Sequence, residues 1–438
     1  MNKKKMHLAQ FVMHGPTYHS IAMWRHPRTQ QDLPWDRPEL YQHIAKVCER
    51  GKFDMVFFAD LSFISDAYQS SLGPSLRYAT QAPLHDPMPL LSWMGAVTDS
   101  IGLASTFSIS HQLPFYAART WASIDHLTRG RAAWNVVTSI NHNESANYGE
   151  DALMEHDLRY ERAEEFLQVC YKLWRSWDED AVVVDRAASV FADPDRVHRI
   201  DHVGRFFDCR GPLNVTRSPQ VGPAIIQAGA SPKGRAFAAK HAEAIFSVNH
   251  FVEGATEYYT DIKTRIENEG RNPDHCKILF GVQPIVGTSE AEAQDKQAAH
   301  NELVPAEGGL AILSSHMDFD ISQLALDDQM GPIDLPGLQS LMRMYSNTAG
   351  RPMSVREVAK MHGESVSLPQ IVGTAAQVAD QLEAYYDTAG GDGFMLSAIY
   401  SPGAIEEFVD LVVPELQQRG RFRTDYAGRT QREHLHQE

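Results

Sequence analysis

The side chains whose chemistry is easiest to interpret lie in the segment IIQAGASPKGRAFAAKHA, residues 225–242. An apolar run comes first, and Ser231 followed by Pro232 has the composition of a helix start. The free backbone N–H groups at such a start, the Ser231 hydroxyl and the nearby Lys233 and Arg235 together suit an anion such as a phosphate. The alternative interpretation is an ordinary capped helix that binds nothing.

Polar residues also end three other apolar runs of the chain. Asp60 follows DMVFFA, Thr106 lies in IGLASTFSI, and Ser139 ends RAAWNVVTS. If these runs are parallel strands of a barrel, their carboxyl ends surround one cavity, where a carboxylate and two hydroxyl groups would meet one ligand. Each of these side chains, taken alone, is also explained as a capping residue.

Three histidines add to this set of candidates. His156 and Tyr160 are four residues apart at the start of a predicted helix, so they share a face near its positive end. His19 lies in the loop HGPTYHSIAMWRHP, and His316 lies in SSHMDFD. Both of these regions can reach a barrel mouth and supply a substrate wall or a proton donor. The alternatives are a surface pair for the first two residues and structural roles for the other histidines.

Several common signatures are missing from the sequence. There is no HExxH motif and no cysteine–histidine cluster with ligand spacing, so we predict no metal site. Neither GxGxxG nor a P-loop occurs, so a nicotinamide cofactor is not expected in the Rossmann manner. The four cysteines are too few and too scattered for a disulfide framework, which is typical of proteins of a reduced cytosol.

The scaffold that must position these side chains is predicted by the order of the apolar runs. Eight short β-rich runs alternate with helical patterns, which indicates a parallel sheet covered on both faces and favours a (β/α)8 barrel, the TIM barrel, over an open sheet. The runs are residues 6–13, 54–60, 101–109, 131–139, 224–230, 244–248, 277–287 and 392–400. Among the helices, four are predicted over 36–51, 157–177, 374–389 and 405–417, the first with Asp36 and Gly51 as its caps.

A length of 438 residues allows two or three domains, but the barrel pattern predicts a single domain over 1–438 with two long connections. These connections span about 140–223 and about 288–391, and both leave the carboxyl ends of strands, where barrel enzymes build their sites. We therefore expect them to shape or cover the pocket, with a packing or oligomer role as the alternative. The Arg-rich tail, about 419–438, is expected to be a docking arm or a frayed end.

Composition excludes other classes of protein. The chain has 43% hydrophobic and 22% charged residues, close to a soluble globular average. Its 40 basic and 56 acidic side chains give a formal charge of −16, which argues against nucleic acid or an anionic membrane as a partner. The sequence shows no targeting segment and no apolar run long enough to span a membrane, so a cytoplasmic location is expected.

Longer motifs in a fixed order identify a family. The chain resembles the bacterial luciferase-like flavin monooxygenases, in the branch of nitrilotriacetate monooxygenase component A, dibenzothiophene sulfone monooxygenase and long-chain alkane monooxygenase. The matching stretches are WRHP (24–27), ERGKFD (49–54), GRAAWNVVTS (130–139), EHDLRYERAEEF (155–166), LWRSWDEDA (173–181), FADPDRVHRIDHVGRFF (191–207), RGPLNVTRSPQ (210–220), QAGASPKGRAFAAKHAEAIF (227–246), DGF (392–394) and VVPELQQRG (412–420). They run almost from end to end, and they are specific to the branch rather than to one substrate.

This resemblance implies an oxygenase that binds reduced FMN (FMNH2) supplied by a separate NAD(P)H-dependent flavin reductase, and that uses O2 through a C4a-peroxyflavin. It also implies a small-molecule substrate and a homodimer or homotetramer. The flavin contacts carried over by the resemblance fall on Asp60, Thr106, His156, Tyr160 and Ser231. The first two are expected near the isoalloxazine ring and the other three toward the ribityl phosphate.

The resemblance also suggests the remaining roles. Ser139 is the candidate for a hydrogen bond near the reacting carbon of the flavin, and His19 and His316 are candidates for the oxygen-transfer or substrate side. Apolar walls of the substrate site are expected from Phe11, Phe246 and Val248.

The substrate itself stays open. The alkane enzyme has a cysteine in its first loop, whereas residues 13–19 here read MHGPTYH. Small organosulfur compounds, amines or aminocarboxylates, and apolar molecules are all compatible with the sequence. Three other functions remain as alternatives: a flavin-binding barrel without catalytic activity, a deazaflavin-dependent oxidoreductase of similar fold and, in last place, a metal-dependent hydrolase barrel.

Overall fold

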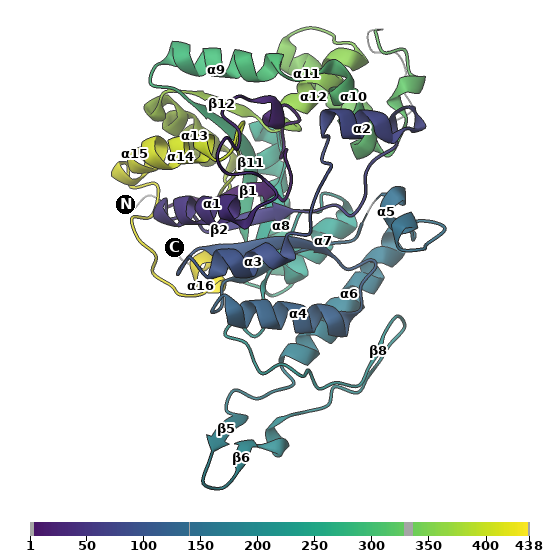
Figure 1. Ribbon diagram of the computed structural model, residues 1–438, viewed down its shortest axis with the longest axis vertical. Coiled ribbons are helices and arrows are strands. Elements are labelled where there is room, and N and C mark those ends of the chain that lie inside the picture. The colour runs from purple at the N-terminus through teal and green to yellow at the C-terminus, as the bar shows by residue number, and fades with distance from the viewer. Residues whose placement is uncertain (1–3, 140, 328–335, 437–438) are drawn as a thin grey trace.

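The structure, a computed structural model, describes residues 4–139, 141–327 and 336–436. Within these residues eight parallel strands close into a barrel, because β1 pairs with both β2 and β13, and β10 pairs with β11 (Figure 1). The barrel strands are β1 (His7–Met13), β2 (Met55–Ala59), β3 (Gly102–Ser108), β4 (Ala132–Val137), β9 (Ala224–Gln227), β10 (Ala244–Ser247), β11 (Lys277–Val286) and β13 (Gly393–Ser397). Each predicted run contains one of them, which confirms the (β/α)8 barrel.

The barrel is held together by apolar side chains on both faces of its strands, as a parallel sheet requires. On the outer face, Trp134 of β4 stacks on Trp121 at a centroid distance of 5.6 Å and contacts Trp174 at 6.4 Å. On the inner face, Phe11, Phe57 and Phe246 form a cluster of rings inside the barrel. The first group fixes helices against the barrel, and the second closes the bottom of the cavity described below.

Helices surround the barrel and form much of the connections between its strands. They are α1 (Pro38–Arg50), α2 (Leu72–Tyr78), α3 (Met88–Gly95), α4 (Pro114–Leu127), α5 (His142–Asn147), α6 (His156–Trp174), α7 (Pro232–His241), α8 (Val252–Asn268), α9 (Glu290–Glu302), α10 (Ala306–Met317), α11 (Pro336–Ala349), α12 (Val355–Ser365), α13 (Ala375–Ala389), α14 (Gly403–Glu407), α15 (Val413–Gln418) and α16 (Gln431–Leu435). A π-helical segment, Phe408–Val412, joins α14 to α15. Short 3-10 turns occur at Met23–Arg25, Tyr68–Ser70, Pro194–Arg196, Pro273–His275 and Ile321–Gln323.

The four predicted helices are present, although one predicted N-cap is wrong. Helix α1 begins at Pro38 after Arg37, which takes the N-cap position in place of Asp36 and makes no side-chain capping bond, whereas Gly51 is the C-cap, as predicted. Helix α13, by contrast, starts in a full capping box made by Thr374 and Gln377.

The two long connections have different structures. The first contains α5 and α6, followed by an extended arm with two hairpins, β5 (Val182–Asp185) with β6 (Val190–Ala192) and β7 (His202–Val203) with β8 (Asp208–Cys209). This arm projects away from the barrel (Figure 1). The second connection contains α9 to α12 and a strand that sequence patterns missed, β12 (Gln370–Gly373), which pairs with the second half of β11. Its helix α10 lies over the carboxyl ends of the strands and contributes to the site.

The tail packs against the amino-terminal end of the barrel rather than fraying, as far as residue 436. The Arg421 carbonyl accepts a hydrogen bond from the backbone N–H of Met6, and Tyr426 donates its hydroxyl proton to the carbonyl of Phe53. The Arg423 guanidinium pairs with Asp54, a carboxylate with no exposed surface. These contacts bring the two ends of the chain together beneath β1 and β2.

Candidate active site

A cavity of about 630 Å³ opens at the carboxyl ends of the barrel strands. Barrel enzymes carry their sites at this end, and the volume is in the usual range for a small-molecule ligand. The floor of the cavity is apolar and aromatic. Phe11, Phe57 and Phe246 lie with their ring centroids about 6 Å apart, and the imidazole of His19 lies 3.8 Å from the ring of Phe11. A planar, partly apolar ring system fits such a floor.

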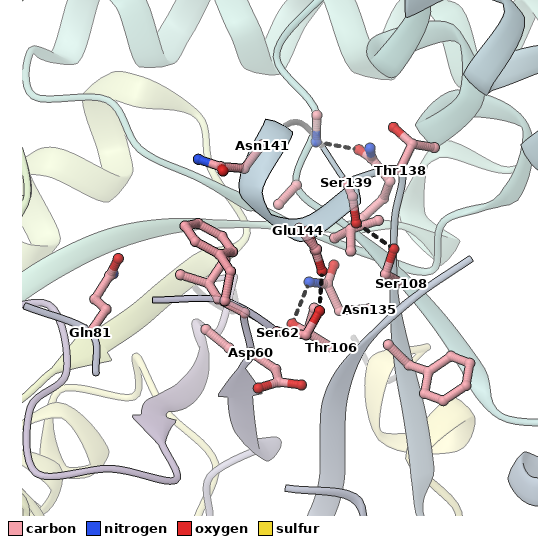
Figure 2. A pocket seen from close by; sticks show the side chains of 18 of the residues that line it. Asp60, Ser62, Gln81, Thr106, Ser108, Asn135, Thr138, Ser139, Asn141 and Glu144 are labelled. Atoms are coloured by element: carbon pink, nitrogen blue, oxygen red, sulfur yellow. Dashed lines mark hydrogen bonds between the residues drawn. The ribbon is translucent and has the colours of Figure 1, made fainter. Parts of the chain in front are cut away.

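Hydroxyl, amide and carboxyl groups line one wall of the cavity (Figure 2). Asn135 of β4 donates its amide N–H to Thr106 Oγ1 at 2.8 Å, and the hydroxyls of Ser108 and Ser139 are 2.6 Å apart. Asp60 lies next to this row at the end of β2. In the described part of the chain, Asn135 Oδ1 is buried with no hydrogen-bond partner, which leaves an acceptor free for a ligand in this wall.

Helix α6 positions two parts of the site at once. Its Arg159 donates hydrogen bonds to the carbonyls of Thr138 and Ser139, which fixes the loop after β4. One residue further along the helix, Tyr160 faces the cavity together with His156. The sequence folds in this way because the apolar face of α6, with Phe166 and Leu167 fully buried, packs on the barrel.

The anion site predicted at the start of α7 has the expected local geometry. Ser231 is the N-cap, with Pro232 as the first helical residue, and its Oγ accepts a hydrogen bond from Gly234 N at 3.1 Å. His156 Nε2 lies 3.2 Å from the same hydroxyl. A Cβ atom at Gly234 would come within 2.7 Å of the Tyr160 hydroxyl, so a larger residue here would push the Tyr160 hydroxyl away from this helix start.

The two cations expected at this site are turned elsewhere. Arg235 donates to the carbonyl of Ala230 and forms an ion pair with Asp261 at 2.9 Å, and Lys233 lies 3.7 Å from Asp157. Neither side chain lines the cavity. The donors that face the cavity are therefore hydroxyl, imidazole and helix N–H groups.

The roof of the cavity is a pair of linked histidines, the half-buried His316 and the buried His362. His316, from α10, lies with Nε2 3.1 Å from Gln81 Oε1 and Nδ1 2.9 Å from His362 Nε2. Since the amide oxygen accepts, His316 carries its proton on Nε2, and its Nδ1 accepts from His362. His362 Nδ1 in turn accepts from the Ser367 hydroxyl at 3.1 Å.

These imidazoles are neutral at neutral pH. Burial lowers the pKa of His316 to about 4, and burial together with the nearby His316 lowers that of His19 to about 3. The pKa of His362 is also well below its ordinary value, first because of burial and then because of the other two rings. A neutral imidazole N–H donates a hydrogen bond without readily releasing its proton, and the N–H of His316 is donated to Gln81, which itself lines the cavity.

The sequence profile of the luciferase-like monooxygenases matches residues 17–424 of the chain. The chain belongs to this family. The resemblance predicted from sequence motifs is thereby confirmed, and the eight-stranded barrel is the fold of its structural relatives.

Relatives of this luciferase-like monooxygenase match nearly the whole chain. Dibenzothiophene-sulfone monooxygenase of Rhodococcus erythropolis (strain XP) is 42% identical over 99% of this chain and 97% of its own length. Long-chain alkane monooxygenase of Geobacillus thermodenitrificans (strain NG80-2) is 39% identical over 99% and 94%. Nitrilotriacetate monooxygenase component A of Aminobacter aminovorans is 39% identical over 94% and 92%. Among solved structures, a riboflavin lyase with modified FMN and riboflavin superposes with a TM-score of 0.89 at 30% identity, over 99% of this chain and 96% of that one.

In this luciferase-like barrel, and apart from Lys233 and Arg235, all but one of the sequence-predicted site residues line the same cavity. Those inside it are Phe11, His19, Asp60, Thr106, Ser139, His156, Tyr160, Ser231, Phe246 and His316. Val248 lies elsewhere: β10 ends at Ser247, so the chain has left the barrel, and Val248 is 43% exposed beside a separate hollow with His250 and Phe251.

The polar residues of the site that sequence reasoning missed include Gln81, Asn135, Glu144 and His362. Only Asn135 carried a signal, since an amide in the middle of an apolar strand needs a partner. Among the described residues, no group of three or more His, Cys, Asp or Glu side chains is arranged to hold a metal ion. None of the described helices has the length and apolar character needed to cross a membrane.

Asp60 gives this monooxygenase a pH dependence that can be measured without a ligand. Burial, followed by the negative charges of Asp86 and Glu144, raises its pKa to about 7. The folded protein then binds this proton more tightly than the unfolded chain, whose aspartate pKa is about 3.9, so this group lowers the stability progressively as the pH rises from about 4 to about 7.

Asp60→Asn removes this titration. We expect the free energy of unfolding of the variant, relative to wild type, to increase by roughly 2–4 kcal/mol between pH 4.5 and pH 8, as measured by urea unfolding at several pH values. Asp151→Asn, at an exposed position outside the cavity, serves as the matched control. A difference that does not change with pH would contradict the raised pKa.

Proposed function

We propose that this protein is the oxygenase component of a two-component FMN-dependent monooxygenase, which oxygenates a small organic substrate with O2. The observation that carries the proposal is one cavity with an aromatic floor at one end and, at the other, the Ser231, His156 and Tyr160 group at a helix start. A flavin mononucleotide needs both: a flat, partly apolar surface for its ring system and neutral donors for its phosphate.

The residues present fit this cofactor. Ser231, His156 and Tyr160 would hold the phosphate, and Asp60, Thr106 and the unpartnered Asn135 oxygen would face the polar edge of the ring. When bound in reduced form, FMN supplies the electrons that activate O2. The chain's own tasks are then to exclude water from the aromatic floor and to present neutral hydrogen-bond donors at the roof. Ser139, fixed by Ser108 and Arg159, is placed to orient a ring from the side.

A separate NAD(P)H-dependent reductase is the proposed source of reduced FMN. The name of one relative, nitrilotriacetate monooxygenase component A, supports a protein that works with a second component. We further propose a cytoplasmic location and a homodimer or homotetramer. The relatives' names cover a sulfone, an alkane and an aminocarboxylate, so the substrate class is proposed only as a small organosulfur, amine-type or apolar molecule.

The direct test supplies purified protein with photochemically reduced FMN and oxygen, in the absence of any reductase, and screens the three substrate classes for an oxygenated product. We expect product that carries one atom from ¹⁸O2, formed only when reduced FMN is present. Tight FMN binding without product for any class would favour the flavin-binding barrel without activity. Turnover with a reduced deazaflavin but not with FMN would favour the oxidoreductase alternative.

The phosphate end of the site makes a separate prediction. Ser231→Ala removes one hydroxyl donor and is expected to weaken FMN binding by about tenfold, while the affinity for riboflavin, which has no phosphate, changes little. Flavin fluorescence quenching measures both affinities. Because Ser231 also caps α7, the variant is expected to lose about 1 kcal/mol of stability.

Ser231→Thr is the matched control. It keeps a hydroxyl both to cap α7 and to contact the phosphate, so it should bind FMN nearly as well as wild type. Equal losses for FMN and riboflavin in Ser231→Ala would show that the phosphate is held elsewhere.

A further inference from the structure

A second cavity, of about 600 Å³, lies at the opposite end of the barrel from the candidate active site. Pro223 and Glu243 place it at the amino-terminal ends of β9 and β10, and Asn272 places it beside the approach to β11. The ends of α6 and α7 form its sides, and α16 of the tail contributes to its rim. The mechanism proposed above uses none of these residues.

The lining of this cavity is strongly cationic. It contains one carboxylate, Glu243, and five permanently basic side chains, Arg175, Arg217, Lys240, Arg271 and Arg432. The chain as a whole has 56 acidic and 40 basic residues, so this balance is the reverse of the general composition. Three histidines, His241, His275 and His436, also face the cavity.

Some of this charge is neutralised within the protein. Glu243 accepts two hydrogen bonds from Arg432, at 2.5 and 3.0 Å. Glu164, outside the lining, pairs with Lys240 at 2.5 Å and with His241 at 2.7 Å. These pairs account for both carboxylates, so they leave no acid for the other arginines.

The remaining guanidinium groups have no carboxylate partner in the described part of the chain. Arg271 is held by the carbonyls of Ala239 and Ala242, both at 2.7 Å, at the end of α7. These two bonds fix the side chain and offset the negative end of that helix, and they use two of its five N–H donors. Arg175 touches only the carbonyl and ring of Tyr171, and Arg217 has no polar contact among the described residues.

Two of the histidines in this cavity are in contact with each other. The rings of His275 and His436 are stacked with centroids 4.1 Å apart. Burial first, and then the nearby His275, lowers the pKa of His436, with Arg432 and Lys277 acting in the same direction against Glu243. Apart from Glu243, the charges that act on His436 are therefore positive.

We propose that this cavity binds a small polyanion that carries phosphate or carboxylate groups. Arg175, Arg217 and the fixed Arg271 all line the cavity and keep N–H donors free, so a ligand with at least two negative charges can contact more than one of them. Guanidinium groups suit such ligands because their planar donors match both oxyanions. The ligand is distinct from the flavin, whose proposed site is at the other end of the barrel.

Isothermal titration of the full-length protein at low ionic strength tests this, with inorganic pyrophosphate as one probe and citrate as the other. We expect one equivalent of the preferred probe to bind per chain. In the double variant Arg175→Gln/Arg217→Gln, its affinity should fall by about 10- to 100-fold. Neither arginine has a carboxylate partner in the described residues, so the variant leaves no buried carboxylate without its counter-charge. The better of the two probes distinguishes a phosphate ligand from a polycarboxylate.

Arg199→Gln, an exposed position outside the cavity, is the matched control and should bind as wild type does. Ser231→Ala locates the anion, since a probe held at the flavin site would lose affinity in this variant and keep it in the double arginine variant. That pattern, or no binding of either probe to wild type, would overturn the proposal. Because the readout is anion binding, it does not depend on monooxygenase activity.

Discussion

His316→Phe is expected to lower the yield of oxygenated product per O2 consumed by about 100-fold, with little change in the affinity for FMN. The reason is that the Nε2 proton of His316 holds Gln81, whose amide group lines the cavity, and the loss of one preorganised donor at a reacting centre typically costs a factor of about 10²–10³. The proposed phosphate contacts lie at the start of α7, away from the roof, so flavin binding should survive.

Three features make His316 the sensitive position in the roof. Its Nε2 proton faces Gln81 at 3.1 Å, its Nδ1 accepts from His362 at 2.9 Å, and burial lowers its pKa to about 4. The ring is therefore held in one tautomer and stays neutral. Phenylalanine keeps a planar aromatic ring at this position but removes both hydrogen bonds, and O2 is then expected to be consumed without transfer to the substrate.

The measurement compares product, O2 consumed and H2O2 released under the same supply of reduced FMN. The expected signature is unchanged O2 consumption with H2O2 replacing the product. His126→Asn, on the exposed surface, is the matched control and should form as much product per O2 consumed as wild type. His362→Leu should show the same uncoupling to a smaller degree, because it leaves His316 in place but frees its tautomer. If His316→Phe forms as much product per O2 consumed as wild type, the roof has no role in transferring oxygen to the substrate.

The barrel was predictable because its strands are signalled locally. All ten residues of β11 are buried, and so are all seven of β1, which gives long apolar runs that few helices share. The strand β12 was missed because its QIVG segment is only half buried and has four residues. The hairpin of β5 and β6 gave no signal for the same reason: it projects from the barrel, with Phe191 64% exposed, and no core selects its pattern.

Residues at strand ends could be predicted as a site, whereas the roof could not. Asp60, Thr106 and Ser139 follow apolar runs, and barrel closure alone brings their strand ends together. His316 and His362 are 46 residues apart on α10 and α12, and only the packing of these two helices brings their rings within 2.9 Å. No spacing in the sequence encodes that contact, so His362 was not a candidate.

The largest expected effect on stability is at the tail, where Arg423→Met should reduce the free energy of unfolding by about 3–5 kcal/mol. Arg423 Nη2 lies 2.5 Å from Asp54 Oδ1, and the carboxylate also receives hydrogen bonds from His7 Nδ1 and Leu8 N, both at 2.8 Å. Asp54 has no exposed surface, so removing the guanidinium leaves a buried carboxylate without its main counter-charge.

The pH dependence separates this electrostatic cause from a loss of packing. Burial alone would raise the pKa of the Asp54 carboxyl, but the adjacent Arg423 and His7 hold it well below its usual range. The stability that the pair contributes is therefore present above the unfolded pKa of about 3.9 and is lost as the pH falls below it. Urea unfolding should show the full difference between wild type and Arg423→Met at pH 7, and a smaller one at pH 3.

Two further variants complete the experiment. Arg429→Met, exposed in the same tail, controls for the loss of one positive charge and should cost little. The double variant Asp54→Asn/Arg423→Met removes the unpaired carboxylate and should recover part of the lost stability. Burying an uncharged amide costs much less free energy than burying a carboxylate without a counter-charge. If Arg423→Met is as stable as wild type at pH 7, the tail is not clamped to the barrel by this pair, and the contacts of Arg421 and Tyr426 must hold it instead.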